Sequence, residues 1–191
     1  TVRTRTNAFL DGQVAAALIV TQLEVQQAGF GVEVLPATPP AVTGNSCLGT
    51  ATPGPAGSIN VDAVLLSNAV LTGTALSGTA QTIATSAVSG NAVIWRSVDL
   101  ASSVSQCSGL IALNGGLKLL PTVACGDASE WNTLTWASAQ DVVAPGTLAQ
   151  TGKEMVFSAQ MVAACAPFGR GEARQSLQID AIIGQSADGI T

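Results

Sequence analysis

Apolar and polar positions alternate with a period of two over several short stretches of this chain. Ile59–Leu65 places polar Asn60 and Asp62 between apolar neighbours. Such alternation is typical of a β-strand with one buried face. The same kind of pattern predicts strands over Met155–Ala163 and Leu177–Ile183, and we interpret Ala92–Leu100, with Trp95 and Arg96 at its middle, as another strand.

The clearest local signal is a hairpin. Two apolar runs, Leu110–Leu113 and Leu117–Leu120, flank the sequence Asn114-Gly115-Gly116. Asn and Gly tolerate the positive φ angles that a tight hairpin turn requires. We therefore predict two antiparallel strands joined at Asn114-Gly115.

Other segments give weaker predictions. The segment Gly12–Gln27 fits both the period of a helix and the period of a strand. We interpret its second half as a strand, because Ile19, Thr21, Leu23 and Val25 occupy alternate positions, and we keep a short helix as the alternative for its first half. Five prolines and four glycines between Leu35 and Gly57 predict a long loop, because Pro fixes φ and lacks a ladder donor. Residues 67–90 indicate short strands and turns, and Ala144-Pro145-Gly146 marks another turn.

Many short strands separated by turns predict an all-β protein, a jelly-roll-like β-sandwich with an N-terminal extension strand. The chain has 191 residues, enough for one sizeable domain. No boundary or repeat interrupts it after the N-terminal segment. We therefore expect a donor-strand segment over residues 1–11 and a single sandwich domain over residues 12–191.

The N-terminal segment has the character of an exposed strand. It alternates, and β-branched residues fill four of its first six positions. Our hypothesis is that it adds to a neighbouring subunit as a polymerisation strand; the alternatives are an edge strand of its own domain or a frayed terminus. Its residues are Thr1, Val2, Arg3, Thr4, Arg5, Thr6, Ala8, Phe9 and Leu10.

Composition narrows the possible functions. Only 10% of residues are charged, yet 47% are hydrophobic, which favours a folded core over disorder. The net charge of −5 and the lack of any Lys/Arg run argue against nucleic-acid binding. No run of about 20 apolar residues predicts a membrane span. The chain opens on Thr1 and shows no signal peptide, so we expect a processed N-terminus.

Catalytic and metal motifs are missing from the sequence. The chain has no His, which excludes a Ser–His–Asp site and the HExxH zinc motif. Neither a phosphate-binding loop nor a DxDxDG calcium loop occurs. We therefore expect no enzyme, no metal and no cofactor.

Four cysteines, an even number without a CxxC pair, favour two disulfides over buried free thiols. Three pairings are possible. We favour Cys107–Cys125, because these residues flank the predicted hairpin, which leaves Cys47–Cys165. Two disulfides indicate an oxidising, extracellular setting.

A carbohydrate-binding or adhesive module is the main alternative function. Trp95, Trp131 and Trp136 would form its binding platform, and Asp127 and Glu130 lie beside two of them as candidate sugar-site carboxylates. The simpler interpretation is a polar loop with tryptophans packed on the sandwich.

Three sequence blocks resemble the TasA/camelysin family of secreted bacterial proteins, whose signal peptides are removed by a SipW-type peptidase. The first joins Ala8-Phe9-Leu10-Asp11 to Gln22-Leu23-Glu24-Val25. The second is the hairpin region Cys107–Leu120. The third runs from Pro145-Gly146 through Met155–Met161 to Gln175–Gln185. Together they cover about half of the chain, in the family's order.

The resemblance implies a jelly roll and an extracellular fibre or matrix role. Metalloprotease activity, described for camelysin-type members, does not carry over to a chain without His. We expect a secreted structural subunit that self-assembles into extracellular filaments or pili, as a homopolymer formed by donor-strand complementation. Cell-surface or matrix components are further expected partners.

Overall fold

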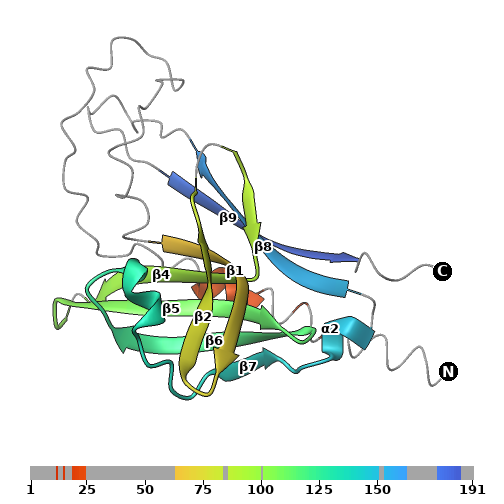
Figure 1. Ribbon diagram of the computed structural model, residues 1–191, viewed down its shortest axis with the longest axis horizontal. Coiled ribbons are helices and arrows are strands. Elements are labelled where there is room, and N and C mark those ends of the chain that lie inside the picture. Colours follow the sequence, from red (N-terminus) through yellow and green to blue (C-terminus); the bar gives the residue numbers. More distant parts are fainter. Residues whose placement is uncertain are drawn as a thin grey trace, which may run out of the picture.

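The computed structural model describes residues 63–83, 86–99, 101–150, 153–162 and 176–185, with helical residues 12, 15 and 19–24 before them. Figure 1 shows the arrangement of its elements. In chain order they are β1 (Ala63–Thr72), β2 (Ala75–Gln81), β3 (Val88–Gly90), β4 (Ala92–Asp99), β5 (Val104–Leu113), β6 (Gly116–Ala124), the 3-10 helix η1 (Ala128–Asn132), β7 (Gln140–Val143), α2 (Thr147–Gln150), β8 (Lys153–Val162) and β9 (Ser176–Gln185).

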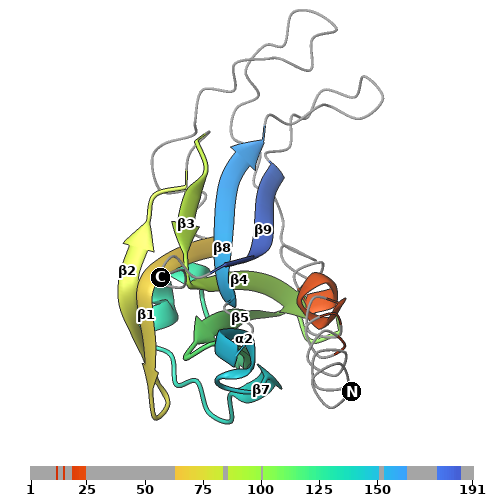
Figure 2. The same cartoon turned by 90° about the vertical axis from the view of Figure 1, so that its right-hand side faces the viewer.

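These strands form two antiparallel sheets. The larger sheet has the order β2-β1-β4-β5-β6-β7, and the smaller sheet has the order β3-β8-β9. In Figure 2 the strands of the smaller sheet run across the direction of β4 and β5. The predicted all-β sandwich is confirmed, and the jelly-roll order of strands stays a prediction.

The central strands of the larger sheet are buried on both faces. The run Val64-Leu65-Leu66 of β1 sends Leu65 to one face and its two neighbours to the other, because successive side chains of a strand point in opposite directions. Leu65, Val93 and Trp95 pack with Met155, Phe157 and Ala159 of the smaller sheet. We call this layer between the sheets the inter-sheet core.

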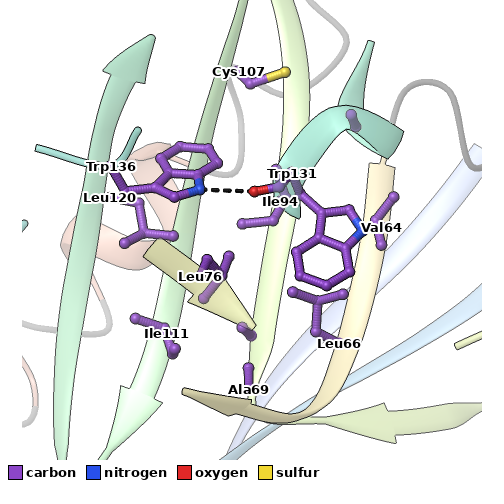
Figure 3. Packing of buried hydrophobic residues seen from close by; sticks show 12 residues of the cluster. Val64, Leu66, Ala69, Leu76, Ile94, Cys107, Ile111, Leu120, Trp131 and Trp136 are labelled. Carbon is purple, nitrogen blue, oxygen red and sulfur yellow. Dashed lines mark hydrogen bonds between the residues drawn. The ribbon is translucent and has the colours of Figure 1, made fainter. Parts of the chain in front are cut away.

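The opposite face of the larger sheet carries a second apolar cluster, drawn in Figure 3, which we call the strap core. Its cover is the segment 125–139, here called the strap, and Leu76 of the edge strand β2 packs into the same cluster. The sheet contributes Val64, Leu66, Ala69, Ala92, Ile94, Cys107, Ile111 and Leu120, and the strap contributes Ala128, Trp131 and Trp136.

The chain crosses from the smaller sheet to the larger one at Gly90-Asn91. A Cβ at Gly90 would lie 2.3 Å from the backbone oxygen of Leu66, so only glycine fits at this close approach. The Asn91 side chain accepts from Ala69 N (2.7 Å) and donates to the carbonyl oxygens of Ala69 (2.9 Å) and Ala112 (3.2 Å). One amide therefore satisfies backbone groups of β1 and β5.

The hairpin prediction is confirmed. Leu113 pairs with Gly116, and Asn114 (φ 52°) and Gly115 (φ 64°) form the turn between β5 and β6. The predicted strands after residue 90 also correspond to β4, β8 and β9. Of the predicted strand Ile59–Leu65, the described residues 63–65 belong to β1.

The strand predicted over the second half of Gly12–Gln27 is wrong, because residues 19–24 are α-helical. In a strand, Ile19, Thr21 and Leu23 would lie on one face. Ile19 and Leu23 are 59% and 57% exposed, however, whereas Thr21 is buried. Ala15, Leu23 and Glu24 are good helix formers, and this local propensity prevails over a short apparent alternation. The long loop predicted over Leu35–Gly57 and the strand predicted over Thr1–Thr6 lie outside the described residues.

Replacing Asn91 with Ala should destabilise the protein by about 2–4 kcal/mol, because it leaves several backbone groups of β1 and β5 without partners. Urea unfolding followed by circular dichroism measures the loss. Asn132→Ala, at an exposed position at the end of η1, is the matched control. An Asn91 variant as stable as the control would contradict the bridging role.

Candidate assembly site

The three tryptophans do not form a binding platform. Trp95 and Trp136 are 1% and 0% exposed, and Trp131 is 9% exposed. Trp95 lies in the inter-sheet core, whereas Trp131 and Trp136 lie in the strap core (Figure 3). The indole Nε1 of Trp136 donates to the carbonyl oxygen of Trp131 at 3.0 Å, and its backbone N donates to Thr74 O at 2.8 Å. The three tryptophans therefore cannot form the exposed aromatic surface that a sugar-binding platform needs.

The carboxylates beside these tryptophans have local structural roles. Asp127 is the N-cap of η1, and its Oδ1 accepts from Ser129 N at 2.7 Å. Glu130 Oε2 accepts from Gly126 N at 2.9 Å. Both side chains thereby satisfy backbone donors of the strap, as caps commonly do. Within the described residues, no group of three or more His, Cys, Asp or Glu side chains is placed to hold a metal ion.

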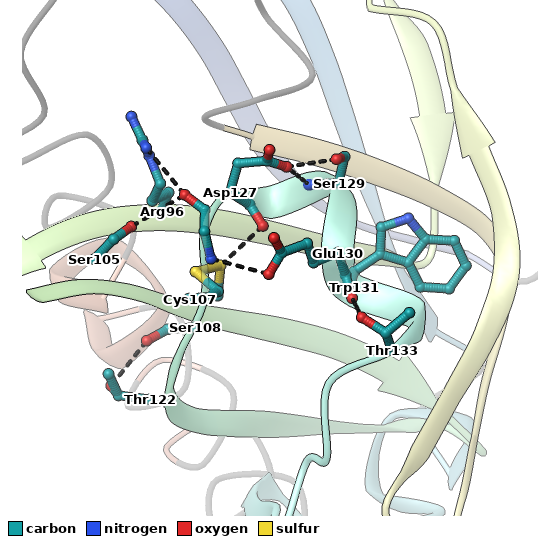
Figure 4. Close-up of a disulfide and its surroundings, with 12 residues drawn as sticks. Arg96, Ser105, Cys107, Ser108, Thr122, Asp127, Ser129, Glu130, Trp131 and Thr133 are labelled. Atoms are coloured by element: carbon teal, nitrogen blue, oxygen red, sulfur yellow. Dashed lines mark hydrogen bonds between the residues drawn. A yellow bond between two sulfur atoms is a disulfide. The ribbon is translucent and has the colours of Figure 1, made fainter.

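The predicted disulfide Cys107–Cys125 is present, with its Cα atoms 5.7 Å apart (Figure 4). It joins β5 to the start of the strap. Cys107 is fully buried in the strap core, and Cys125 packs against the same cluster. The pair Cys47–Cys165 lies outside the described residues.

A β-bulge in β6 sets the position of Cys125. Cys107 pairs with Val123 but Gly109 pairs with Leu120, so β6 has one extra residue between these pairs. Pro121, which lacks a backbone donor, falls in this irregular stretch. After the bulge, Val123 and Cys125 face the strap core like Leu120, although their sequence positions differ from it by odd numbers.

The edges of the two sheets are the remaining candidates for a functional surface. β3 has three residues and β7 has four, and Asp141 of β7 pairs with Lys118 Nζ at 2.5 Å. Short edges, and a charged side chain such as Asp141 on β7, discourage pairing with another chain. The two longer edges are β2, with seven residues, and β9, with ten.

β9 combines length with an apolar face. Among the described strands, it pairs with β8 only, over ten residue pairs from Lys153↔Gln185 to Val162↔Ser176. Ile179, Ala181 and Ile183 point toward the inter-sheet core but are only half-buried. The opposite face carries exposed Gln178, Asp180 and Ile182.

The predicted polymerisation strand, Thr1 to Leu10, lies outside the described residues, so its pairing stays a prediction. Sequence reasoning did not identify β9 as an open edge. Its alternation predicted the strand correctly, but only the sheet order shows that it lies outermost in the described part of the smaller sheet. Within the described residues, no helix has the length and apolar character needed to cross a membrane.

Replacing Cys107 and Cys125 together with Ser should lower the free energy of unfolding by about 3 kcal/mol, because the disulfide closes a loop of 18 residues in the unfolded chain. Peptide mapping without reduction identifies the bond, and denaturant unfolding measures the loss. Val104→Ala, at an exposed position of the same strand β5, serves as a control for local disturbance. Recovery of Cys107 and Cys125 as free thiols from untreated protein would rule out the bond.

The intrinsic fluorescence of the native protein should have a blue-shifted maximum, because all three indoles are buried. Added mono- and oligosaccharides should leave it unchanged, and denaturant should shift it to the red. Trp136→Ala should cost about 3–5 kcal/mol of stability through loss of the strap core. A sugar-dependent shift in emission would restore the platform interpretation.

Comparisons with protein-family models, curated proteins and solved structures gave no match. The resemblance to the TasA/camelysin family therefore rests on the three sequence blocks described above.

Proposed function

We propose that this protein is a secreted structural subunit that assembles with copies of itself into extracellular filaments by strand addition. The observation that carries the proposal is the position of β9, a ten-residue strand with a half-buried apolar face that lies outermost in the described part of the smaller sheet. An edge strand presents backbone N–H and C=O groups that another strand can pair with. A strand supplied by the next copy satisfies these groups and covers the apolar face at once.

Other features of the chain support an assembly role. The three tryptophans that suggested a carbohydrate site are packed in the two cores, and the two carboxylates, Asp127 and Glu130, accept from backbone donors of the strap. The disulfide is compatible with an oxidising environment outside the cell. A surface built mainly from uncharged polar residues suits repeated contact between copies, because few charges need to be desolvated.

The geometry of strand donation favours a filament over a closed oligomer. Each copy donates its N-terminal segment forward and accepts a segment from the copy behind, so the contact is heterologous. Heterologous contacts that do not close into a ring generate open fibres. The homopolymer needs no second kind of subunit in this scheme.

Deleting residues 1–10 should give a folded protein that does not form filaments. Negative-stain microscopy and sedimentation compare the truncated and complete chains at equal concentration, and tryptophan emission confirms that the truncated chain is folded. A synthetic peptide of residues 1–10 should bind the truncated chain in a 1:1 ratio without restoring polymers.

A second variant, Thr4→Pro, tests the same segment in a chain of full length. Proline removes a backbone donor from the middle of the segment without shortening the chain. This variant should also prevent filaments. Filaments formed by the truncated chain, or a complete chain that is monomeric at high concentration under all conditions tried, would refute donation by this segment.

A further inference from the structure

The turn between β5 and β6 is held by the segment that follows β7, residues 144–148, which we call the clamp (Figure 1). Gly146 N donates to the carbonyl oxygen of Asn114 at 2.7 Å, and Leu148 N donates to the carbonyl oxygen of Gly115 at 2.8 Å. The Leu148 side chain is fully buried in the inter-sheet core. Both central carbonyl groups of the turn are therefore fixed from outside the hairpin, by a segment that has its own anchor in the core.

Asn114 stands in the sequence context in which asparagine is chemically most labile. It is exposed, and it is the one asparagine of the chain that precedes a glycine. The backbone nitrogen of Gly115 can attack Cγ of Asn114, which forms a new C–N bond and releases the side-chain nitrogen as ammonia. Water then opens the cyclic imide at either carbonyl and leaves aspartate or isoaspartate. Glycine favours the attack because it has no side chain to hinder its nitrogen.

The conformation of the turn opposes this reaction. Asn114 has a φ of 52°, in the left-handed region, where ψ is about +47°. At this ψ the Cβ of a residue lies across the Cα–C bond from the following nitrogen, so its Cγ is out of reach of that nitrogen. Asn114 must leave the left-handed conformation to react, and its carbonyl oxygen then turns away from Gly146 N.

The packing behind the turn leaves little room for such a rotation. A Cβ at Gly116 would lie 2.7 Å from the backbone oxygen of Val143 and 3.0 Å from the carbonyl group of Ala144. The chain that leads into the clamp thus lies directly against the residue that follows the turn. Rotation at Asn114 therefore requires the clamp to move away from the hairpin.

We propose that Asn114 is a latent deamidation site, kept unreactive by the clamp and modified only when this end of the larger sheet opens. Isoaspartate carries the main chain through its Cβ and Cγ, which adds one backbone atom to the turn. The pairing of Leu113 with Gly116 and the acceptor for Gly146 N are then lost. A transient opening of the hairpin thereby becomes a permanent change in the protein.

The reaction is followed in the tryptic peptide Ser97–Lys118, in which Asn114 is the one asparagine. Exchange of NH2 for OH raises the mass of this peptide, and chromatography separates the aspartate and isoaspartate forms. The native protein should deamidate about ten- to a thousandfold more slowly than the protein unfolded in guanidinium chloride, because the open turn is a minor state of about 0.1–10%. Asn132 precedes a threonine and should stay unmodified in the same digests.

Two leucine variants distinguish opening of the clamp from unfolding of the whole protein. Leu148→Ala removes the anchor of the clamp and should raise the native deamidation rate about tenfold or more, because a truncated buried leucine destabilises the segment that it holds. Leu76→Ala truncates a leucine that is 3% exposed in the strap core and should change the rate by less than about twofold, since separate sites act independently. Equal acceleration by both variants would overturn the clamp as the protecting element. Tryptophan emission verifies that each variant is folded.

A measurement on the unchanged protein tests the same point where Leu148→Ala does not fold. The amide hydrogens of Gly146 and Leu148 should be protected from exchange to a degree similar to the slowing of deamidation. Unprotected amides in a protein that deamidates slowly would overturn the clamp. Asn114→Asp is the baseline control, because Asp-Gly also forms this turn and has no side-chain nitrogen to release. A native protein that deamidates as fast as the unfolded one, or an unfolded protein unmodified at Asn114, would overturn the site.

Discussion

The constraint on which this structure depends is that the central strands of the larger sheet are apolar on both faces. In β1 and β4, consecutive residues such as Val93, Ile94 and Trp95 are all nearly inaccessible to solvent. A sheet of this kind is stable only when both faces are covered, since each buried aliphatic side chain contributes about 1.5–3 kcal/mol. The smaller sheet provides one cover and the strap provides the other. The disulfide, the η1 cap and the Gly90-Asn91 crossing all hold one of these covers in place.

Local patterns in the sequence predicted the elements whose signals are local. The Asn114-Gly115 turn followed from residues that accept positive φ, and the alternation of β8 and β9 identified their core-facing residues. The Cys107–Cys125 pair followed from the hairpin that joins the two cysteines. Each of these inferences needed only neighbours in the chain, so no knowledge of the sheet order was required.

Features that depend on distant partners could not be predicted in this way. Trp131 and Trp136 lie in a polar loop sequence, and their burial depends on the far face of a sheet formed by strands up to about 70 residues earlier. Residues 19–24 were wrongly predicted as a strand, because a stretch of six residues can fit both the helical period and the strand period. The burial of Thr21, with Ile19 exposed, distinguishes the two. The outermost position of β9 among the described strands of the smaller sheet is a property of strand order, which alternation does not encode.

The bulge in β6 has a consequence for how this chain tolerates change in length. The extra residue near Pro121 shifts the phase of the strand by one position, so that odd-numbered Val123 and Cys125 share a face with even-numbered Leu120. Deleting one residue there would restore a regular ladder in which Val123 still lies opposite Cys107, so Cys125 would keep the face that it shares with Cys107. Deleting Ala124 instead, beyond the bulge, would turn the Cys125 sulfur toward the opposite face. Sequences that share this strap would therefore be expected to vary by one residue in length between Leu120 and Val123, and to keep the spacing from Val123 to Cys125 fixed.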